Sequence, residues 1–218
     1  MKKKLFVTTL LLTLSFVLAG KAEAIVVDGL AGDWVGIDPV VTDGAEDGIP
    51  DKYDISDVFV TDNGNTIFFR IDVYNPPPTF EGEWGPEVLY QIAIDVDNNP
   101  LSGFTGDGSN GLGLETIINY TVDGASIFQY SSGWSYTGSA VAAMNQVMEV
   151  GSTLNMLGIT TGDTIAFFVY LDNAGQPPDD FAPDLGGASH HTTVPEPSTI
   201  LLLGQGGLLL LLVKKKLK

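Results

Sequence analysis

Short runs of alternating apolar and polar residues dominate the middle of this 218-residue chain. Such alternation is typical of β-strands with one buried face, and no stretch between the two ends has a sustained helical period. Asn63-Gly64 separates two of these runs, which predicts a tight hairpin. The pattern predicts an all-β fold, an antiparallel β-sandwich of jelly-roll or Greek-key type, with strands over residues 25–27, 55–61, 66–74, 88–95, 116–122, 126–130, 145–150 and 164–171.

The N-terminal segment has the composition of a secretory signal peptide. Three lysines precede an apolar run over residues 5–18, and Ala-Glu-Ala at residues 22–24 provides the small residues of a cleavage site. We therefore expect an exported protein whose mature chain begins near Ile25. The expected organisation is a signal peptide over 1–24, a β-domain over 25–189, a linker over 190–193 that contains His190 and His191, and a sorting signal over 194–218.

The C-terminal segment carries the features of that sorting signal. Pro195-Glu196-Pro197 is followed by an apolar run of about 14 residues and a basic cluster over 214–218. A full transmembrane helix needs ~20 apolar residues, so a permanent tail anchor is the weaker interpretation. The segment resembles the PEP-CTERM signal of Gram-negative bacteria. The resemblance implies processing by an exosortase, transient attachment to the inner membrane through the apolar helix, and a destination in the cell envelope or extracellular matrix.

Charge is distributed very unevenly along the chain. Eight of the 10 basic residues lie in the two end segments, so Lys52 and Arg70 alone accompany nearly all of the 27 acidic residues in the body. An acidic domain repels nucleic acid and attracts divalent cations. The chain has no cysteine, so no disulfide stabilises it outside the cytoplasm.

The turn after the predicted strand 88–95 is a candidate calcium site. Asp95, Asp97 and Asn99 stand at alternate positions, and their oxygens are the ligands that Ca²⁺ prefers. The turn is not an EF-hand, because Pro100 and Gly106 occupy the positions at which that loop needs glycine and glutamate. The alternative is a solvated acidic turn without metal.

A second acidic loop matches a calcium loop more closely by position. Its acids stand at loop positions 1, 5, 9 and 12, which are Asp43, Asp47, Asp51 and Asp54, with glycine at position 6. The loop resembles a thrombospondin type 3 calcium repeat. Ala45 stands at position 3, where a further ligand is expected. A flexible acidic loop is the alternative.

The order of short motifs along the body resembles the β-sandwich modules related to family 9 carbohydrate-binding modules and the DOMON-like superfamily. The motifs are Asp28-Gly29, Gly32-Asp33-Trp34, the segment 54–58 before the Asn-Gly hairpin, the segment 94–103, and the acidic segment 179–184. The resemblance implies a two-sheet sandwich with structural Ca²⁺, and sugar binding through paired tryptophans in some members. Trp34 matches a position that is usually structural in these modules.

Aromatic residues on loops rich in glycine, serine and proline provide a candidate sugar-binding surface, although the same residues could equally pack in the core. These residues are Trp84, Trp134, Tyr130 and Tyr136. A nucleophilic triad needs a histidine, and residues 25–189 contain none. We expect an exported, Ca²⁺-stabilised, non-enzymatic β-sandwich of the envelope or matrix; the alternative is a carbohydrate-binding module for exopolysaccharide.

Overall fold

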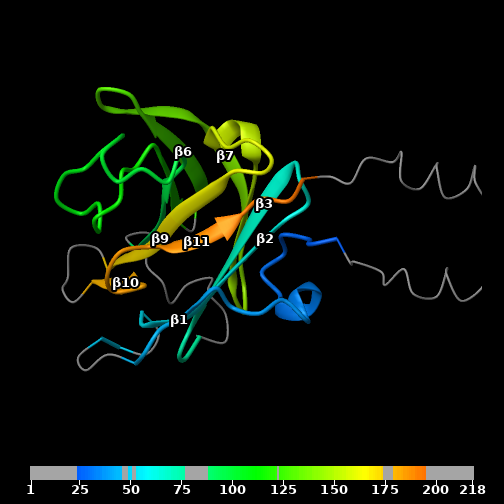
Figure 1. Cartoon of the computed structure of the whole chain (residues 1–218). Helices are drawn as coiled ribbons and strands as arrows, with labels where there is room; N and C mark the ends of the chain where they lie inside the picture. Colours follow the sequence, from blue (N-terminus) through cyan, green and yellow to red (C-terminus); the bar gives the residue numbers. More distant parts are fainter. Residues whose placement is uncertain are drawn as a thin grey trace, which may run out of the picture.

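Eleven antiparallel strands form one curved sheet in the part of the chain that the structure describes (Figure 1). The computed structural model describes residues 24–45, 49–50, 53–76, 88–121, 123–173 and 179–194. Two short 3₁₀ helices, η1 (Ala31–Trp34) and η2 (Leu154–Leu157), accompany the strands. The strands are β1 (Val41–Thr42), β2 (Ile55–Asp62), β3 (Thr66–Val73), β4 (Val88–Asp95), β5 (Thr116–Thr121), β6 (Gly124–Tyr130), β7 (Trp134–Met144), β8 (Met148–Thr153), β9 (Thr164–Asn173), β10 (Asp180–Ala182) and β11 (Ala188–His191).

The sheet curves until its two ends nearly meet. Its strand order is β1-β2-β3-β8-β7-β6-β5-β4-β9-β10, and β11 pairs with β9 beside β10. The long strand β7 bridges the two halves of the sheet, because its first part pairs with β6 and its last part with β8. At the seam, which is the place where the two ends of the sheet approach each other, the backbone N–H of Ile55 in β2 donates a hydrogen bond to the carboxylate of Asp180 in β10. The predicted all-β class is confirmed, and the antiparallel sheet is nearly closed into a barrel.

Alternate residues of most strands point into the main hydrophobic core. On β3 the buried side chains include Ile67, Phe69 and Ile71, and on β4 they include Tyr90 and Ile92. The ring of Phe69 lies edge-on to Phe167 of β9, with centroids 5.5 Å apart. The period-2 alternation that predicted these strands is therefore the pattern by which the sheet buries one face.

Most predicted strands correspond to observed ones, with three kinds of difference. Residues 25–27 are not a strand, because the backbone N–H of Val26 donates to the side chain of Asp33 and not to a neighbouring strand. The strand predicted over 145–150 begins only at Met148, because the N–H groups of Gln146 and Val147 donate to the carbonyl of Gly29. Strands β1, β7, β10 and β11 were not predicted, since they are short or largely exposed.

The connection from β4 to β5 covers part of the outer face of the sheet. Phe104, Leu112 and Leu114 of this connection pack on outward side chains such as Ile117 of β5 and Phe168 of β9. The connection therefore buries a second, smaller apolar cluster against the sheet. It also carries the acidic turn after β4.

The N-terminal segment is fastened to the sheet by one buried carboxylate. Glu149 of β8 accepts hydrogen bonds from the backbone N–H groups of Asp28 and Gly29 and from the indole N–H of Trp34. Gly29 has φ of 76°, and a Cβ at that position would lie 2.7 Å from Asn145, so glycine is required for this approach. Glu149 therefore holds the segment from Asp28 to Trp34 against the sheet.

The C-terminal end of the described chain is part of the sheet. Residues 190–193 were expected to be a linker, but His190 and His191 belong to β11 and pair with Ile165 and Thr164 of β9. The imidazole of His190 lies 2.9 Å from a carboxylate oxygen of Asp62 in β2. The pairing of β11 could not be predicted from the sequence, because its residues do not alternate between apolar and polar.

The two described chain ends emerge on the same side of the domain (Figure 1). Ala24 and Asp62 line one hollow, and the backbone N–H of Thr193 donates to Asp62. Within the described residues no helix has the length and apolar character needed to cross a membrane. The predicted signal peptide, the Pro195-Glu196-Pro197 motif and the tail after it lie outside these residues.

Candidate metal centre

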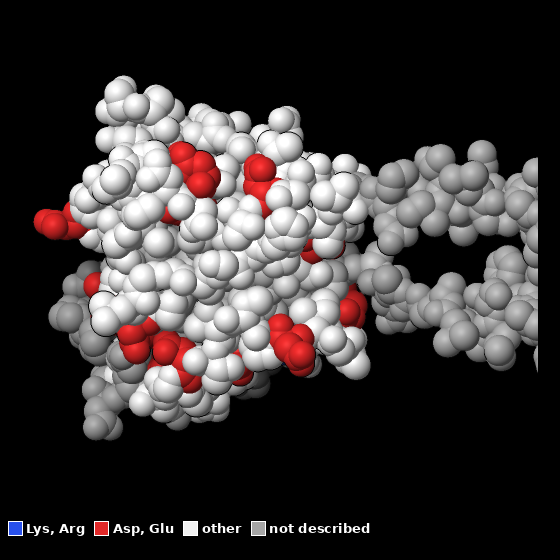
Figure 2. All heavy atoms as spheres, viewed as in Figure 1, with Lys and Arg blue, Asp and Glu red and all other residues white. Residues whose placement is uncertain are grey.

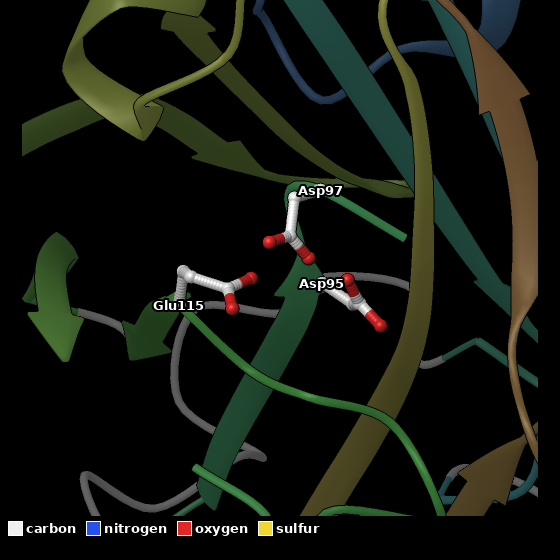
Figure 3. A group of neighbouring side chains, drawn as sticks. All are labelled: Asp95, Asp97 and Glu115. Atoms are coloured by element: carbon white, nitrogen blue, oxygen red, sulfur yellow. The ribbon is translucent and has the colours of Figure 1, made fainter. Parts of the chain in front are cut away.

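Three carboxylates meet where β4 ends and β5 begins. Because Ile94 of β4 pairs with Thr116 of β5, the residues just outside this pair, Asp95 and Glu115, lie side by side. Asp97 follows two residues later, as the chain turns away from the sheet. One oxygen of each carboxylate lies within 4.8 Å of the others (Figure 3). The antiparallel register thus joins residues that are twenty positions apart.

Backbone N–H groups hold these carboxylates in place. Asp95 is 1% exposed, and its two oxygens accept hydrogen bonds from the N–H groups of Asn99 and Gly113 at 3.0 and 3.2 Å. Glu115 accepts one from the N–H of Val96 at 2.8 Å. These bonds fix the carboxylates but leave oxygens facing one another (Figure 3).

The hydroxyl of Ser102 lies among the same oxygens. Its Oγ is 2.9 Å from an oxygen of Asp97, 2.9 Å from one of Glu115 and 3.0 Å from the carbonyl oxygen of Asn99. A hydroxyl carries a single proton, so it can donate to only one of these acceptors at a time. The remaining oxygens form a concentrated acceptor set of the kind that a hard cation occupies.

The predicted ligand Asn99 has a different place from the two aspartates. Its side-chain oxygen accepts a hydrogen bond from the N–H of Leu101, so the amide shapes the turn. Sequence reasoning missed Glu115 and Ser102. The available signal was that Glu115 is the acid directly before the strand that pairs with β4.

The close approach of the two sides of the loop requires glycine at position 113. A Cβ there would lie 2.3 Å from the carbonyl oxygen of Asn99 and 2.4 Å from that of Ser102. No real Cβ contact is that short, so a side chain would push the acidic turn away from Glu115. The glycine therefore keeps the three carboxylates together.

Among the described residues, no lysine, arginine or histidine forms an ion pair with the carboxylates of this cluster. Burial is the main cause that raises the pKa values of Asp95 and Glu115, and the charge of Asp97 adds to it. Arg70, the one arginine or lysine among the described residues, pairs with Asp72 and lies over Phe59. Figure 2 shows acidic groups and no basic ones on the visible described face. A divalent cation would offset this repulsion.

The second predicted calcium loop is described only in part. Asp43 follows β1 and Asp54 precedes β2, whereas Asp47 and Asp51 lie outside the described residues. Tyr74 joins the two ends: its N–H donates to the carbonyl of Asp54, and its hydroxyl donates to the carbonyl of Asp43. The structure therefore brings the first and last acids of the loop to one place.

Two of the candidate sugar-binding aromatics lie together on the outer face of the sheet. The rings of Tyr130 and Trp134 are 5.3 Å apart, and Phe104 lies 5.9 Å from Trp134. Tyr136 lies apart from them against Phe128, and Trp84 lies outside the described residues. Beside Trp134 is a hollow of about 390 Å³, lined by Gln91, Phe104, Asp107, Gly108, Leu114, Ile117, Trp134, Tyr170 and Phe181.

No protein-family model matches the chain, and no curated protein sequence matches it.

Proposed function

We propose that this protein is an exported, non-enzymatic β-domain that Ca²⁺ stabilises, and that it serves as a component of the bacterial envelope or extracellular matrix. The observation that carries the calcium proposal is the convergence of Asp95, Asp97 and Glu115 at the start of one loop and its end. A bound cation would fasten both ends of the β4–β5 connection to the sheet.

The chemistry of the cluster favours calcium over other metals. The donors are all oxygens, which suit hard cations, and no cysteine exists to bind a softer one. Ca²⁺ accepts six to eight oxygens in irregular arrangements, whereas Mg²⁺ demands near-ideal octahedral geometry. Three carboxylates with the nearby hydroxyl of Ser102 match the more permissive ion.

A structural function is also consistent with where the histidines lie. His190 contacts Asp62, and His191 contacts Thr164 at 3.0 Å. Both contacts join β11 to neighbouring elements, which gives the histidines a role in closing the sheet. We infer further that the curved sheet is a β-sandwich related to the DOMON-like modules, with the buried Trp34 as the structural residue of its Gly-Asp-Trp motif.

The export proposal rests on the signal peptide and the PEP-CTERM-like tail of the sequence. The described ends of the chain lie on one side of the domain (Figure 1), so a membrane-held tail would leave the opposite side of the domain free. The enzyme proposed to process the tail is an exosortase.

Tail processing can be tested in a Gram-negative host that has an exosortase. The full chain is expected to yield a product that has lost the apolar run and the basic cluster, as measured by intact mass. Replacing Pro195, Glu196 and Pro197 by alanine should leave the tail in place and the protein in the membrane fraction. Equal processing of both chains would refute the sorting proposal.

A second candidate function is binding of exopolysaccharide in the hollow beside Trp134. The favouring observation is that aromatic rings and the side-chain amide of Gln91 line the same space. Aromatic faces stack on sugar rings, and amide groups bind hydroxyls in both donor and acceptor roles. Gln91 is held by its hydrogen bond to Asn119 at 2.9 Å, which fixes its orientation.

Sugar binding can be tested on a glycan array with two matched variants. Trp134→Ala should weaken binding about tenfold, which corresponds to about 1.4 kcal/mol. Tyr136→Ala removes an aromatic ring from the same strand outside the hollow and should leave affinity unchanged. Absence of any binding by the parent chain, or equal effects of the two substitutions, would remove this candidate.

A further inference from the structure

A hollow of about 610 Å³ lies beside the first described residues of the chain. Its wall includes Ala24 and Ile25, together with Asp33 of η1 and Asp62 at the end of β2. The sequence predicts that signal-peptide cleavage separates Ala24 from Ile25. Cleavage of this bond would create a new α-amino group on Ile25, at the wall of the hollow.

The carboxylate of Asp33 has one oxygen that is engaged and one that is not. Its Oδ2 accepts a hydrogen bond from the backbone N–H of Val26, the residue after Ile25. Its Oδ1 is buried and has no hydrogen-bond partner among the described residues. Folded proteins rarely leave such an oxygen unpaired, because removing a carboxylate oxygen from water is costly. A cationic donor at Oδ1 would offset that cost.

The new amino group of Ile25 is close enough to be this donor. Its nitrogen is one residue from the nitrogen of Val26, and one residue of extended chain spans at most ~3.6 Å. Because the N–H of Val26 already contacts Oδ2 of Asp33, a change in the backbone dihedrals of the freed Ile25 can bring its nitrogen to Oδ1. An ammonium group has three N–H donors, whereas the same nitrogen in the uncleaved chain is an amide with one.

No other cation is paired with Asp33 in the part of the chain that the structure describes. Arg70, the one arginine or lysine there, pairs elsewhere, and His190 contacts Asp62. Burial is the main cause that raises the pKa of Glu149, and the charge of Asp33 adds to it. The carboxylates of Asp33 and Glu149 thus repel each other, and a positive charge at Asp33 would offset the repulsion.

We propose that the α-ammonium group of mature Ile25 docks in the hollow and forms an ion pair with Asp33. The inference rests on the proposed export of the protein, because removal of the signal peptide after Ala24 creates this group. The ion pair would fasten the mature N-terminus to η1, next to the hydrogen bonds by which Glu149 holds the segment from Asp28 to Trp34. Signal-peptide removal would thus complete the N-terminal contacts of the domain.

Titration of the α-amino group in the exported chain tests the proposal. The chain is purified from a Gram-negative host and treated with an acylating reagent at several pH values, and its N-terminal peptide is quantified by mass spectrometry. An unpaired α-amino group has a pKa of about 7.7–8.0, and pairing with a carboxylate raises it. At about pH 7, acylation of Ile25 should therefore be about tenfold slower in the parent chain than in Asp33→Asn. The substitution keeps an oxygen that can accept from Val26.

Asp38→Asn is the matched control, because Asp38 is an exposed aspartate of the same segment and its loss changes the net charge equally. Its α-amino group should be acylated as slowly as that of the parent chain. Equal rates in the parent chain and Asp33→Asn, or the same increase in both variants, would overturn the ion pair and leave the export proposal standing. An exported chain whose N-terminal peptide does not begin at Ile25 would overturn both the ion pair and the predicted cleavage site.

Urea unfolding at two pH values measures the same ion pair through stability. Because pairing raises the pKa of the α-amino group in the folded state, its contribution is fully present below about pH 7.7 and is lost as the pH rises through the raised value. From about pH 7 to about pH 10, the urea midpoint of the parent chain should therefore fall further than that of Asp33→Asn. The other titratable groups near the hollow, Asp62, His190 and Glu149, are the same in both chains.

A chain with one glycine inserted between Ala24 and Ile25 keeps Asp33 but moves the amino group one residue away. It should therefore behave as Asp33→Asn in both the acylation and the unfolding experiments. A fall in the urea midpoint of the parent chain equal to that in either variant would contradict the proposal.

Discussion

Replacing Glu149 by alanine is expected to lower the free energy of unfolding by about 3–4 kcal/mol. The substitution removes the one side chain that accepts hydrogen bonds from Asp28, Gly29 and the indole of Trp34. Each buried donor left without a partner costs about 1–3 kcal/mol, and these costs are not fully additive. Glu149 is 1% exposed and Trp34 2% exposed, so water cannot readily replace the lost acceptor.

Urea unfolding of the parent chain and four variants measures this effect. Glu149→Gln keeps one carbonyl acceptor and should lose less than Glu149→Ala. Trp34→Phe removes only the indole donor, while Asp123→Asn should stay within about 0.5 kcal/mol of the parent. If the free energy of unfolding of Glu149→Ala lies within 1 kcal/mol of that of the parent chain, this carboxylate does not hold the segment from Asp28 to Trp34.

Calcium is expected to produce the other large effect. A ligand present at a hundred times its dissociation constant, and bound only by the folded state, adds about 2.7 kcal/mol to stability. The melting temperature of the full chain should therefore be higher with Ca²⁺ than with chelator. The physical reason is that the ion offsets repulsion among Asp95, Asp97 and Glu115, which have no basic partner among the described residues.

The variant Asp97→Asn isolates this cluster in the melting experiment. Asp97 is the exposed member of the group, so the variant should fold. It should lose the part of the Ca²⁺-dependent rise in melting temperature that belongs to the Asp95 cluster. An unchanged Ca²⁺ response in Asp97→Asn would exclude the cluster as a metal centre.

The local pattern was sufficient to predict the strands that bury one face. β3 alternates buried and half-buried residues along its whole length, and β2 and β3 are joined through the predicted Asn-Gly hairpin. β7 was missed because most of its first seven residues are exposed. Its backbone is extended because β6 and then β8 pair with it, and tertiary pairing of this kind leaves little trace in hydropathy.

The residues of the candidate metal site were likewise predicted only in part from the sequence. Asp95 and Asp97 were found because acids at alternate positions where a strand ends can be recognised in the sequence. Glu115 was missed because its place beside Asp95 depends on which strands pair. Such contacts depend on which strands pair. Strand pairing is determined by the whole chain and not by a short local motif.

The most direct test of the calcium proposal is a crystal structure of the protein grown with Ca²⁺. We expect anomalous difference density between Asp95, Asp97 and Glu115, with carboxylate oxygens about 2.3–2.6 Å from the ion. Crystals soaked in chelator should lose the density and show the same backbone with the turn less ordered. A well-ordered Ca²⁺-grown structure with only water or a sodium ion among these three carboxylates would contradict it.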